Sequence, residues 1–165
     1  MRDLKGFQGS VEKRTLVSFP KEGVYEALHC LDKWSLYLPH IQKLETIYDD
    51  GRYQEFIMHV VSEDNNLLKV RSVRRCNQQD EIEYFQPKPP EFLLHHAGQW
   101  KLNAIDENKT ELVARHFWNA NVERACEYFS VQQSDISSKI EALLGNHALF
   151  AMNTWKETLE AGKYQ

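Results

Sequence analysis

The stretch Ser134–Gly162, SDISSKIEALLGNHALFAMNTWKETLEAG, decides the fold that we expect for this chain. Its apolar residues recur at steps of three and four, which places them on one side of a helix. They are Ile136, Ile140, Leu143, Leu144, Ala148, Ala151, Trp155 and Leu159. Polar residues fill the opposite side. A helix this long with one apolar side needs a large apolar surface to pack against, and the residues before it predict that this surface is a sheet.

The preceding sequence predicts strands that are joined mostly by hairpins. Turn signals at Asp49–Gly51 and Asp106–Asn108, and a polar turn at Ser62–Asn66, separate segments rich in β-forming residues. The prolines in Pro87–Pro90 predict a break in the chain. We expect strands at Ser10–Phe19, Ile41–Tyr48, Tyr53–Val61, Leu67–Cys76, Glu81–Gln86, Phe92–Ala104 and Thr110–Asn119.

Two short helices are expected after the first strand, one starting at Pro20 and one over Asp32–Pro39. The connection Asn121–Gln133 has no definite form from its sequence beyond an early helical turn. Hairpin strands followed by a long helix predict an α+β fold with an antiparallel sheet curled around the C-terminal helix. With no internal repeat or linker, residues 1–165 are expected to form a single domain.

Composition narrows the possible partners and the compartment. Apolar residues make up 42% of the 165 residues, and the net charge of -4 predicts no binding to nucleic acid or to an anionic membrane. Cys30, Cys76 and Cys126 form no CxxC pair, which argues against a zinc site or a disulfide framework and for a reducing compartment. No signal peptide or membrane-spanning run is visible. We therefore expect a cytoplasmic protein without a bound metal.

Three segments together resemble a known family. The first is P-x-x-x-V-Y-x-x-L followed by D-x-W, which ends at Trp34; the second is the strand V-R-S-V-R-R over residues 70–75. The third is P-P-x-F followed by G-x-W at Gly98 and Trp100, with an R-H-x-W strand after it. Together they resemble the aromatase/cyclases of bacterial aromatic polyketide synthesis, which belong to the START-like, helix-grip superfamily.

This resemblance implies a fold and an activity. The fold is a seven-stranded antiparallel sheet wrapped around the C-terminal helix. The activity is to take a poly-β-ketone from an acyl carrier protein, to close its first ring by aldol condensation and to dehydrate it to an aromatic ring. No metal or redox cofactor is implied. The oligomeric state stays open between monomer and homodimer.

Arg74 is the first candidate catalytic residue. It lies on an alternating strand, and the other residues on its side are small or apolar, so this side should face the interior. They are Val70, Ser72 and Cys76. Arg74 also matches the arginine that the family places in its pocket. A buried guanidinium suits an enolate or ketone oxygen that carries developing negative charge. A shift of one residue in register would instead put Arg75 inside.

His116 is the second candidate catalytic residue. It shares a mostly apolar strand face with Trp118 and matches a position where some relatives carry a polar pocket residue. A histidine titrates near neutrality, so it could move the proton that aldol closure and loss of water require. A core histidine bonded to a backbone carbonyl is the alternative. His96 shares a face with Gly98 and Trp100 and is a further candidate. The remaining histidines, His147 among them, show no partner pattern.

Aromatic side chains are expected to line a substrate pocket, although core packing is the alternative role for each one. The candidate substrate-binding residues are Trp34, Tyr37, Ser72, Phe92, His96, Trp100, Trp118 and Asn146. Lys69, Arg71 and Arg75 form a basic edge on the outer side of the arginine strand, which could steer an acidic carrier protein or be a solvated sheet face.

Two other functions fit the same expected fold. The first is a non-catalytic carrier of a hydrophobic ligand such as a lipid or a quinone, and the second is another lyase or hydrolase of the superfamily. A carrier pocket could be wholly apolar, whereas a cyclase needs polar groups that converge. Arg74 and His116 on inward faces therefore favour the cyclase.

Overall fold

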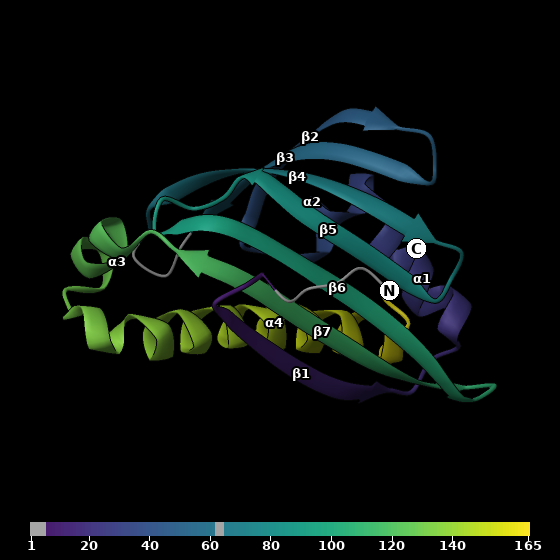
Figure 1. Cartoon of the computed structure of the whole chain (residues 1–165). Coiled ribbons are helices and arrows are strands. Elements are labelled where there is room, and N and C mark those ends of the chain that lie inside the picture. Colours follow the sequence, from purple (N-terminus) through teal and green to yellow (C-terminus); the bar gives the residue numbers. More distant parts are fainter. Residues whose placement is uncertain (1–5, 62–64) are drawn as a thin grey trace.

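The structure is a computed structural model that describes residues 6–61 and 65–165, so the predicted polar turn at Ser62–Asn66 falls partly outside the described residues. Seven antiparallel strands form one sheet in the order β1-β7-β6-β5-β4-β3-β2. A long helix, α4, lies along one face of this sheet (Figure 1). The strands are β1 (Gly9–Val17), β2 (Ile41–Asp49), β3 (Tyr53–Val61), β4 (Leu67–Asn77), β5 (Glu81–Lys88), β6 (Leu93–Asp106) and β7 (Lys109–Ala120).

The helices occupy the ends of the sheet and one face of it. α1 (Lys21–His29) is followed by the 3-10 turn η1 (Leu31–Lys33) and by a single turn of helix, α2 (Trp34–Tyr37). At the opposite end α3 (Val122–Phe129) leads through the 3-10 turn η2 (Gln133–Asp135) into α4 (Ile136–Glu160). The predicted α+β, helix-grip arrangement, with two short helices after the first strand, is confirmed.

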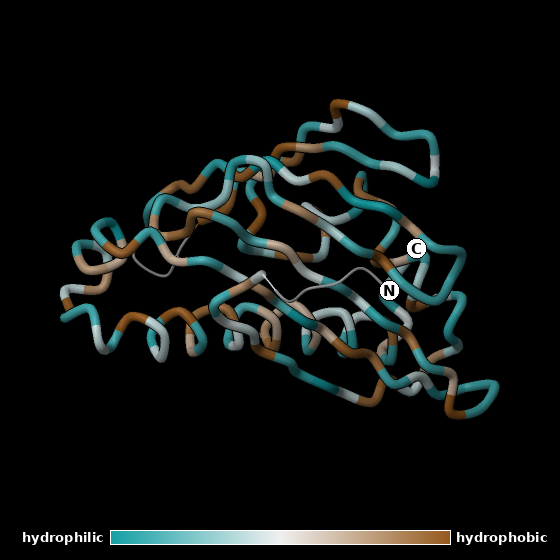
Figure 2. Tube along the Cα trace, in the orientation of Figure 1, coloured by the Kyte–Doolittle hydropathy of each residue, from teal (hydrophilic) through white to brown (hydrophobic). Residues whose placement is uncertain are grey.

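α4 forms because its apolar residues repeat with the period of a helix, and it buries them against the sheet, chiefly against β1 and β7. Figure 2, which colours the Cα trace by hydropathy, shows hydrophobic positions recurring along this helix. The buried positions are Ile136, Ile140, Leu144, Gly145, Ala148, Met152, Trp155, Thr158 and Leu159. The expected stripe is therefore largely confirmed, although Leu143 and Ala151 are only half-buried.

Two expectations for the connections needed correction. β5 does not end at Gln86 but continues through Pro87 to Lys88. Its pairing with β4 is irregular between the pair Val73 and Phe85 and the pair Arg71 and Lys88. A proline, which has no N–H to donate, is tolerated at such an irregularity. The connection after β7 contains a full helix, α3. The side chain of Asn121 caps its first turn by accepting a hydrogen bond from the backbone N–H of Arg124.

Candidate functional site

Polar residues from neighbouring strands form one row across the inner face of the sheet. In register, Gln54 of β3 lies opposite Arg74 of β4, Arg74 opposite Tyr84 of β5, Tyr84 opposite Gly98 of β6, and Gly98 opposite His116 of β7. Gln54, Arg74 and His116 are buried. Three strand spacings of about 4.8 Å separate Arg74 from His116, so their backbones lie roughly 14 Å apart. The inner face therefore carries two polar groups with Tyr84 between them.

Arg74 forms the first polar group, and the prediction that it faces the interior is confirmed, because only 2% of its surface is exposed. Its Nε donates to Oε1 of Gln54 at 2.6 Å, and its Nη2 donates to the carbonyl oxygen of His29 at 2.7 Å. The guanidinium also lies over the ring of Trp34, 5.0 Å from its centre. Arg75 points the other way and pairs with Glu83.

Burial lowers the pKa of Arg74 to about 10, so the side chain still carries its charge at neutral pH. Its hydrogen bonds are to a neutral amide and to a backbone carbonyl, so no carboxylate among the described residues is in direct contact with the positive charge. A buried cation held in this way is well suited to an anionic or strongly polarised oxygen of a ligand.

A surface hollow of about 1000 Å³ lies against the Arg74 group. Its lining includes His29, whose carbonyl binds Arg74, and Cys76, whose thiol donates to the same Gln54 oxygen at 3.4 Å. The hollow is bordered by the β2–β3 and β4–β5 turns. The full lining is Tyr25, His29, Asp50, Gly51, Arg52, Cys76, Asn77, Gln78, Gln79 and Asp80. The hollow thus lies at the end of the sheet where Arg74 is buried.

Two histidines form the second polar group. Nδ1 of His116 lies 2.8 Å from the hydroxyl of Tyr84 and 2.9 Å from Nε2 of His96. Nδ1 of His96 in turn lies 2.5 Å from Oε1 of Gln86. The two imidazole rings are nearly parallel, with 19° between their planes. The structure therefore brings the two predicted histidines into direct contact and adds Tyr84 and Gln86 to them.

Both histidines are neutral at physiological pH. Burial and, to a smaller extent, the nearby charge of His147 on α4 together lower the pKa of His116 to about 4. Burial also lowers the pKa of His96 well below its ordinary value, with contributions from His116 and His147. A neutral imidazole has one nitrogen with a free lone pair, so each of these two histidines can accept a proton.

Tyr84 reaches His116 by crossing over Gly98. A side-chain carbon added at Gly98 would collide with the ring and hydroxyl of Tyr84, so only glycine leaves the space that the phenol occupies. Burial raises the pKa of this phenol, which is therefore protonated across the physiological range. The Gly98 of the G-x-W segment thus has a direct role in building the second polar group.

Ser72 is also on the inner face, two residues before Arg74, and it is buried with 1% of its surface exposed. Its hydroxyl makes no hydrogen bond within the part of the chain that the structure describes. A buried hydroxyl without a partner is costly, and one that faces the interior is ready to bind a polar ligand atom. Ser72 therefore remains a candidate binding residue.

The predicted aromatic residues divide between two cores. Trp34 belongs to the larger core and contacts Arg74, and the half-buried Trp100 packs against the same core. Phe92 and Trp118 belong to the second core beneath α3, where Phe92 contacts Tyr128 and Phe129. Of the four, the structure joins Trp34 to the Arg74 group, and it places Trp118 opposite His96 in the β6–β7 pairing.

Two predicted residues lie away from both polar groups. The hydroxyl of Tyr37 donates to the carbonyl oxygen of Lys163 and accepts from the backbone N–H of Gln165, so it holds the C-terminal segment in place. Asn146 is exposed on α4. The adjacent His147 is the α4 residue whose charge acts on His96 and His116, and the sequence had given no reason to single it out.

Sequence reasoning missed Gln54, Tyr84 and Gln86. The signal that could have found them is strand alternation, because Tyr84 and Gln86 share the inward side of β5 with the buried Ile82. Gln54 likewise lies on the same side of β3 as the buried Phe56. Polar residues on an otherwise apolar strand side carry the same information that identified Arg74.

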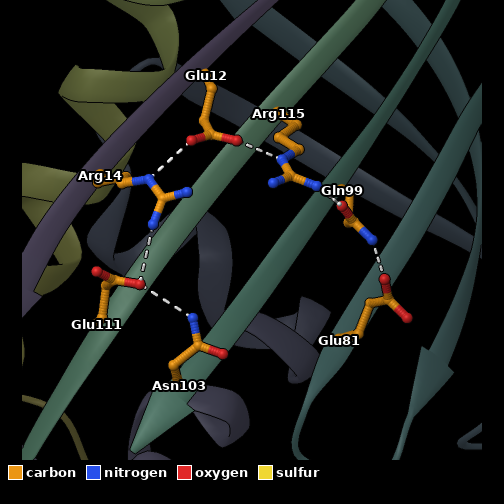
Figure 3. A network of polar contacts seen from close by, with 7 residues as sticks. All are labelled: Glu12, Arg14, Glu81, Gln99, Asn103, Glu111 and Arg115. Carbon is orange, nitrogen blue, oxygen red and sulfur yellow. Dashed lines mark hydrogen bonds and ion pairs between the residues drawn. The ribbon is translucent and has the colours of Figure 1, made fainter. Parts of the chain in front are cut away.

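The outer face of the sheet is covered by paired charges. Figure 3 shows Glu12 of β1 between Arg14 and Arg115, with the network continuing through Gln99 to Glu81. The basic edge follows the same pattern, because Arg71 pairs with Glu55 and Arg75 pairs with Glu83. Two of the three residues in that edge are thus neutralised by carboxylates, which favours the solvated-face interpretation over a carrier-protein site.

Further features bear on the expected cofactors and location. The three cysteines are free thiols. Among the described residues, no three histidine, cysteine, aspartate or glutamate side chains come together in a way that could hold a metal ion. No helix in the described ranges is both long and apolar enough to cross a membrane.

The seven-stranded antiparallel sheet and the long C-terminal helix packed against it define the helix-grip fold. Solved structures of this fold include StfQ, a di-domain aromatase/cyclase of the steffimycin pathway, with a TM-score of 0.85 and 24% identity. The similarity covers 93% of this chain and 52% of StfQ, so the chain spans about half of that protein.

Two further structures are similar over nearly their whole length. ZhuI, an aromatase/cyclase from Streptomyces sp. R1128, has a TM-score of 0.80 and 20% identity, and the similarity covers 92% of this chain and 93% of ZhuI. A START superfamily protein from Mycobacterium smegmatis has a TM-score of 0.72 and 11% identity over 92% of this chain and 97% of the other. At these identities the similarity defines the fold.

No protein-family model matches the sequence, and no curated protein matches it in sequence. The function therefore has to be argued from the site.

Proposed function

We propose that this protein is an aromatase/cyclase. It would take a poly-β-ketone that is bound to an acyl carrier protein, close its first ring by aldol condensation and dehydrate that ring to an aromatic product. The observation that supports this most is the row on the inner face, which carries the Arg74 cation at one end and the neutral histidine pair at the other. Structures of the same fold include proteins named aromatase/cyclases.

His116 would move the protons. A methylene carbon between two ketones loses a proton to the imidazole, and the electron pair of the broken C–H bond moves onto the neighbouring oxygen as an enolate. The enolate carbon then forms a bond to a distant ketone carbon, and the imidazolium returns the proton to the oxygen of that ketone, which becomes a hydroxyl. In the dehydration His116 takes the second proton of the former methylene carbon, the electron pair of that C–H bond forms the C=C bond, and the C–O bond breaks as the imidazolium protonates the leaving hydroxyl to water. Because the pKa of His116 is lowered to about 4, its protonated form gives up the proton readily.

Arg74 would act at another part of the substrate. Its backbone lies about 14 Å from that of His116 by strand spacing, and an extended poly-β-ketone can span this distance. The guanidinium would bind ketone or enolate oxygens, while Trp34 and Phe56 pack around it. Holding the chain at both ends of the row limits which carbons can meet, and this positioning selects one ring among the several that form spontaneously.

The proposal carries further expectations. The aldol closure and the dehydration need proton transfers but no oxidant or reductant, so no cofactor is required. A substrate that is bound to a carrier protein would be met inside the cell, so we expect the protein in the cytoplasm. The substrate would enter between the sheet and α4, and the hollow at the β2–β3 and β4–β5 turns offers one approach to Arg74.

The test is to reconstitute the protein with a minimal polyketide synthase and to separate the products. We expect Arg74→Ala to change both the rate and the distribution of rings, because the substrate loses an anchor. We expect His116→Ala to slow ring closure and dehydration by on the order of a hundredfold or more.

Arg75→Ala is the matched control, since Arg75 lies next to Arg74 in sequence but points to the outer face and pairs with Glu83. It should leave both rate and products unchanged. If Arg74→Ala folds normally and gives the same ring at the same rate, the catalytic assignment is wrong, and a non-catalytic carrier of a hydrophobic ligand becomes the better explanation.

A further inference from the structure

Gln86, His96 and His116 form a chain of hydrogen bonds whose direction can be worked out from its first member. The atom of Gln86 that faces His96 is the carbonyl oxygen Oε1, which can only accept a hydrogen bond. Nδ1 of His96, 2.5 Å away, must therefore carry the hydrogen. All three side chains are buried, with 7%, 4% and 9% of their surfaces exposed, so water does not compete for these bonds.

The next bond follows from the charge state of His96. Burial keeps this imidazole neutral, so a hydrogen on Nδ1 leaves Nε2 as a bare acceptor. Nε2 lies 2.9 Å from Nδ1 of His116, and two bare nitrogens would repel each other at this distance. Nδ1 of His116 must therefore be the donor. Since His116 is also neutral, its second nitrogen, Nε2, has no hydrogen and carries the free lone pair.

We propose that Gln86 and His96 are positioning residues that hold His116 in the tautomer with hydrogen on Nδ1, so that Nε2 is the atom that accepts the substrate proton. This inference rests on the proposed function for its catalytic consequence, but the tautomer is a property of the protein alone. The contacts of His116 with Tyr84 and His96 are both made through Nδ1, so they leave the other ring nitrogen, Nε2, available to the substrate.

The same arrangement assigns a role to Tyr84. Its oxygen lies 2.8 Å from Nδ1 of His116 and shares the hydrogen that Nδ1 carries, so the phenol acts as an acceptor in this contact. The hydrogen of the phenol then remains available to a ketone oxygen of the substrate. Because Gly98 opens the space for the ring, one glycine places a hydroxyl donor beside the imidazole base.

The tautomers can be measured without substrate. Protein labelled with ¹⁵N-histidine gives ring-nitrogen shifts that distinguish a hydrogen on Nδ1 from one on Nε2, and His96→Gln and His116→Gln variants assign the signals. At pH 7 we expect both His96 and His116 to carry hydrogen on Nδ1. A wild-type His116 that carries its hydrogen on Nε2 overturns the proposal.

Gln86→Met removes the acceptor at similar side-chain length. His96 should then move its hydrogen to Nε2 and donate to Nδ1 of His116, which forces the His116 hydrogen onto Nε2. Ring closure should slow by on the order of a hundredfold, while the affinity for a non-cyclising substrate analogue stays unchanged. Gln99→Met on the outer face of β6 is the matched control and should change neither the tautomers nor the rate.

The outcomes separate this inference from the proposed function. Tautomers that do not respond to Gln86→Met, or a tautomer change without a change in rate, would overturn the positioning role. A wild-type protein that shows both expected tautomers but produces no ring in the reconstituted synthase contradicts the cyclase activity and supports the tautomer assignment. Circular dichroism and thermal unfolding of each variant establish that the spectra come from folded protein.

Discussion

Replacing Gly98 by alanine tests how tightly the Tyr84 ring packs beside His116. A methyl group at this position would collide with the Tyr84 ring, so Gly98→Ala forces the phenol away from His116. We expect a loss of about 1–3 kcal/mol in the free energy of unfolding, as is usual when a packed site is overfilled. Urea unfolding followed by tryptophan fluorescence gives this number.

A double-mutant cycle with Tyr84→Ala provides the control for this prediction. The atoms nearest to the added methyl all belong to Tyr84, so Gly98→Ala should cost little once that ring is gone. Gly6→Ala should have no effect in either background, because no atom of the described residues beyond its chain neighbours lies within 4 Å of the added carbon. Equal costs of Gly98→Ala with and without the Tyr84 ring would show that another contact decides the packing here.

The candidate site shows what a single sequence reveals at the level of residues. Alternation along β4 favoured Arg74 over Arg75 but left a shift of one residue in register open, and the structure decides it by burying Arg74 and pairing Arg75 with Glu83 on the outer face. The contacts between His116 and its partners could not be predicted in the same way, since they depend on which strands are neighbours and on their register. On α4 the expected Asn146 and the observed His147 differ by one position, which turns a helical side chain by about 100°.

At the scale of elements, α4 lies close to β1 at Gly145. An added methyl group would lie 3.0 Å from Cε of Lys13 and 3.4 Å from Cγ2 of Val11. The lysine end is flexible and can move aside. Alanine is favoured over glycine inside a helix by about 1 kcal/mol, so we expect Gly145→Ala to stabilise the protein by up to that amount.

Thermal and urea unfolding of Gly145→Ala test the sign of this change. Gly145→Leu is the companion variant, since a long side chain would collide with β1 and should destabilise the protein. A Gly145→Ala variant that is less stable than wild type would mean that the helix and β1 cannot separate even by a few tenths of an ångström.

The elements themselves were largely predictable, for physical reasons that differ between them. The period of α4 and the hairpin turn at Asp49–Gly51 are local signals, so both were located correctly. α3 was left undefined because it is short, and its clearest signal is the single capping residue Asn121. β5 was predicted to end too early because tertiary pairing tolerates Pro87 where the ladder is irregular.

For the whole molecule, the buried histidines should make stability depend on pH. The pKa of His116 is lowered from 6.5 to about 4 in the folded state, so the unfolded chain binds more protons between these values. Stability from this group is fully present above pH 6.5 and is lost as the pH falls toward 4. The expected loss for His116 is on the order of 3 kcal/mol. The pKa of His96 is also lowered in the folded state, so this residue changes stability in the same direction. His147 is the nearby titratable group on α4.

Urea unfolding at several pH values between 4 and 7 measures this dependence. His116→Gln, which cannot be protonated, should flatten the curve over that range. His95→Gln is the matched control, because His95 is exposed and bonds to Asn119 on the surface. If the wild type and His116→Gln lose stability in parallel, the acid sensitivity comes from other groups.

The pairing of β1 with β7 has a consequence for how the protein folds as it is synthesised. Gly9 lies opposite Trp118, so β1 is synthesised before the other strands of this sheet and finds its partner only after they have followed. Loop closure over such a separation is slow compared with hairpin formation. The hairpins from β2 to β7 can form in order. β1 can pair only after β7 has been made, and α4 can pack only after β1 and β7 have paired. We therefore expect the folding of this sheet to finish in one late step that joins β1 and α4 to β7.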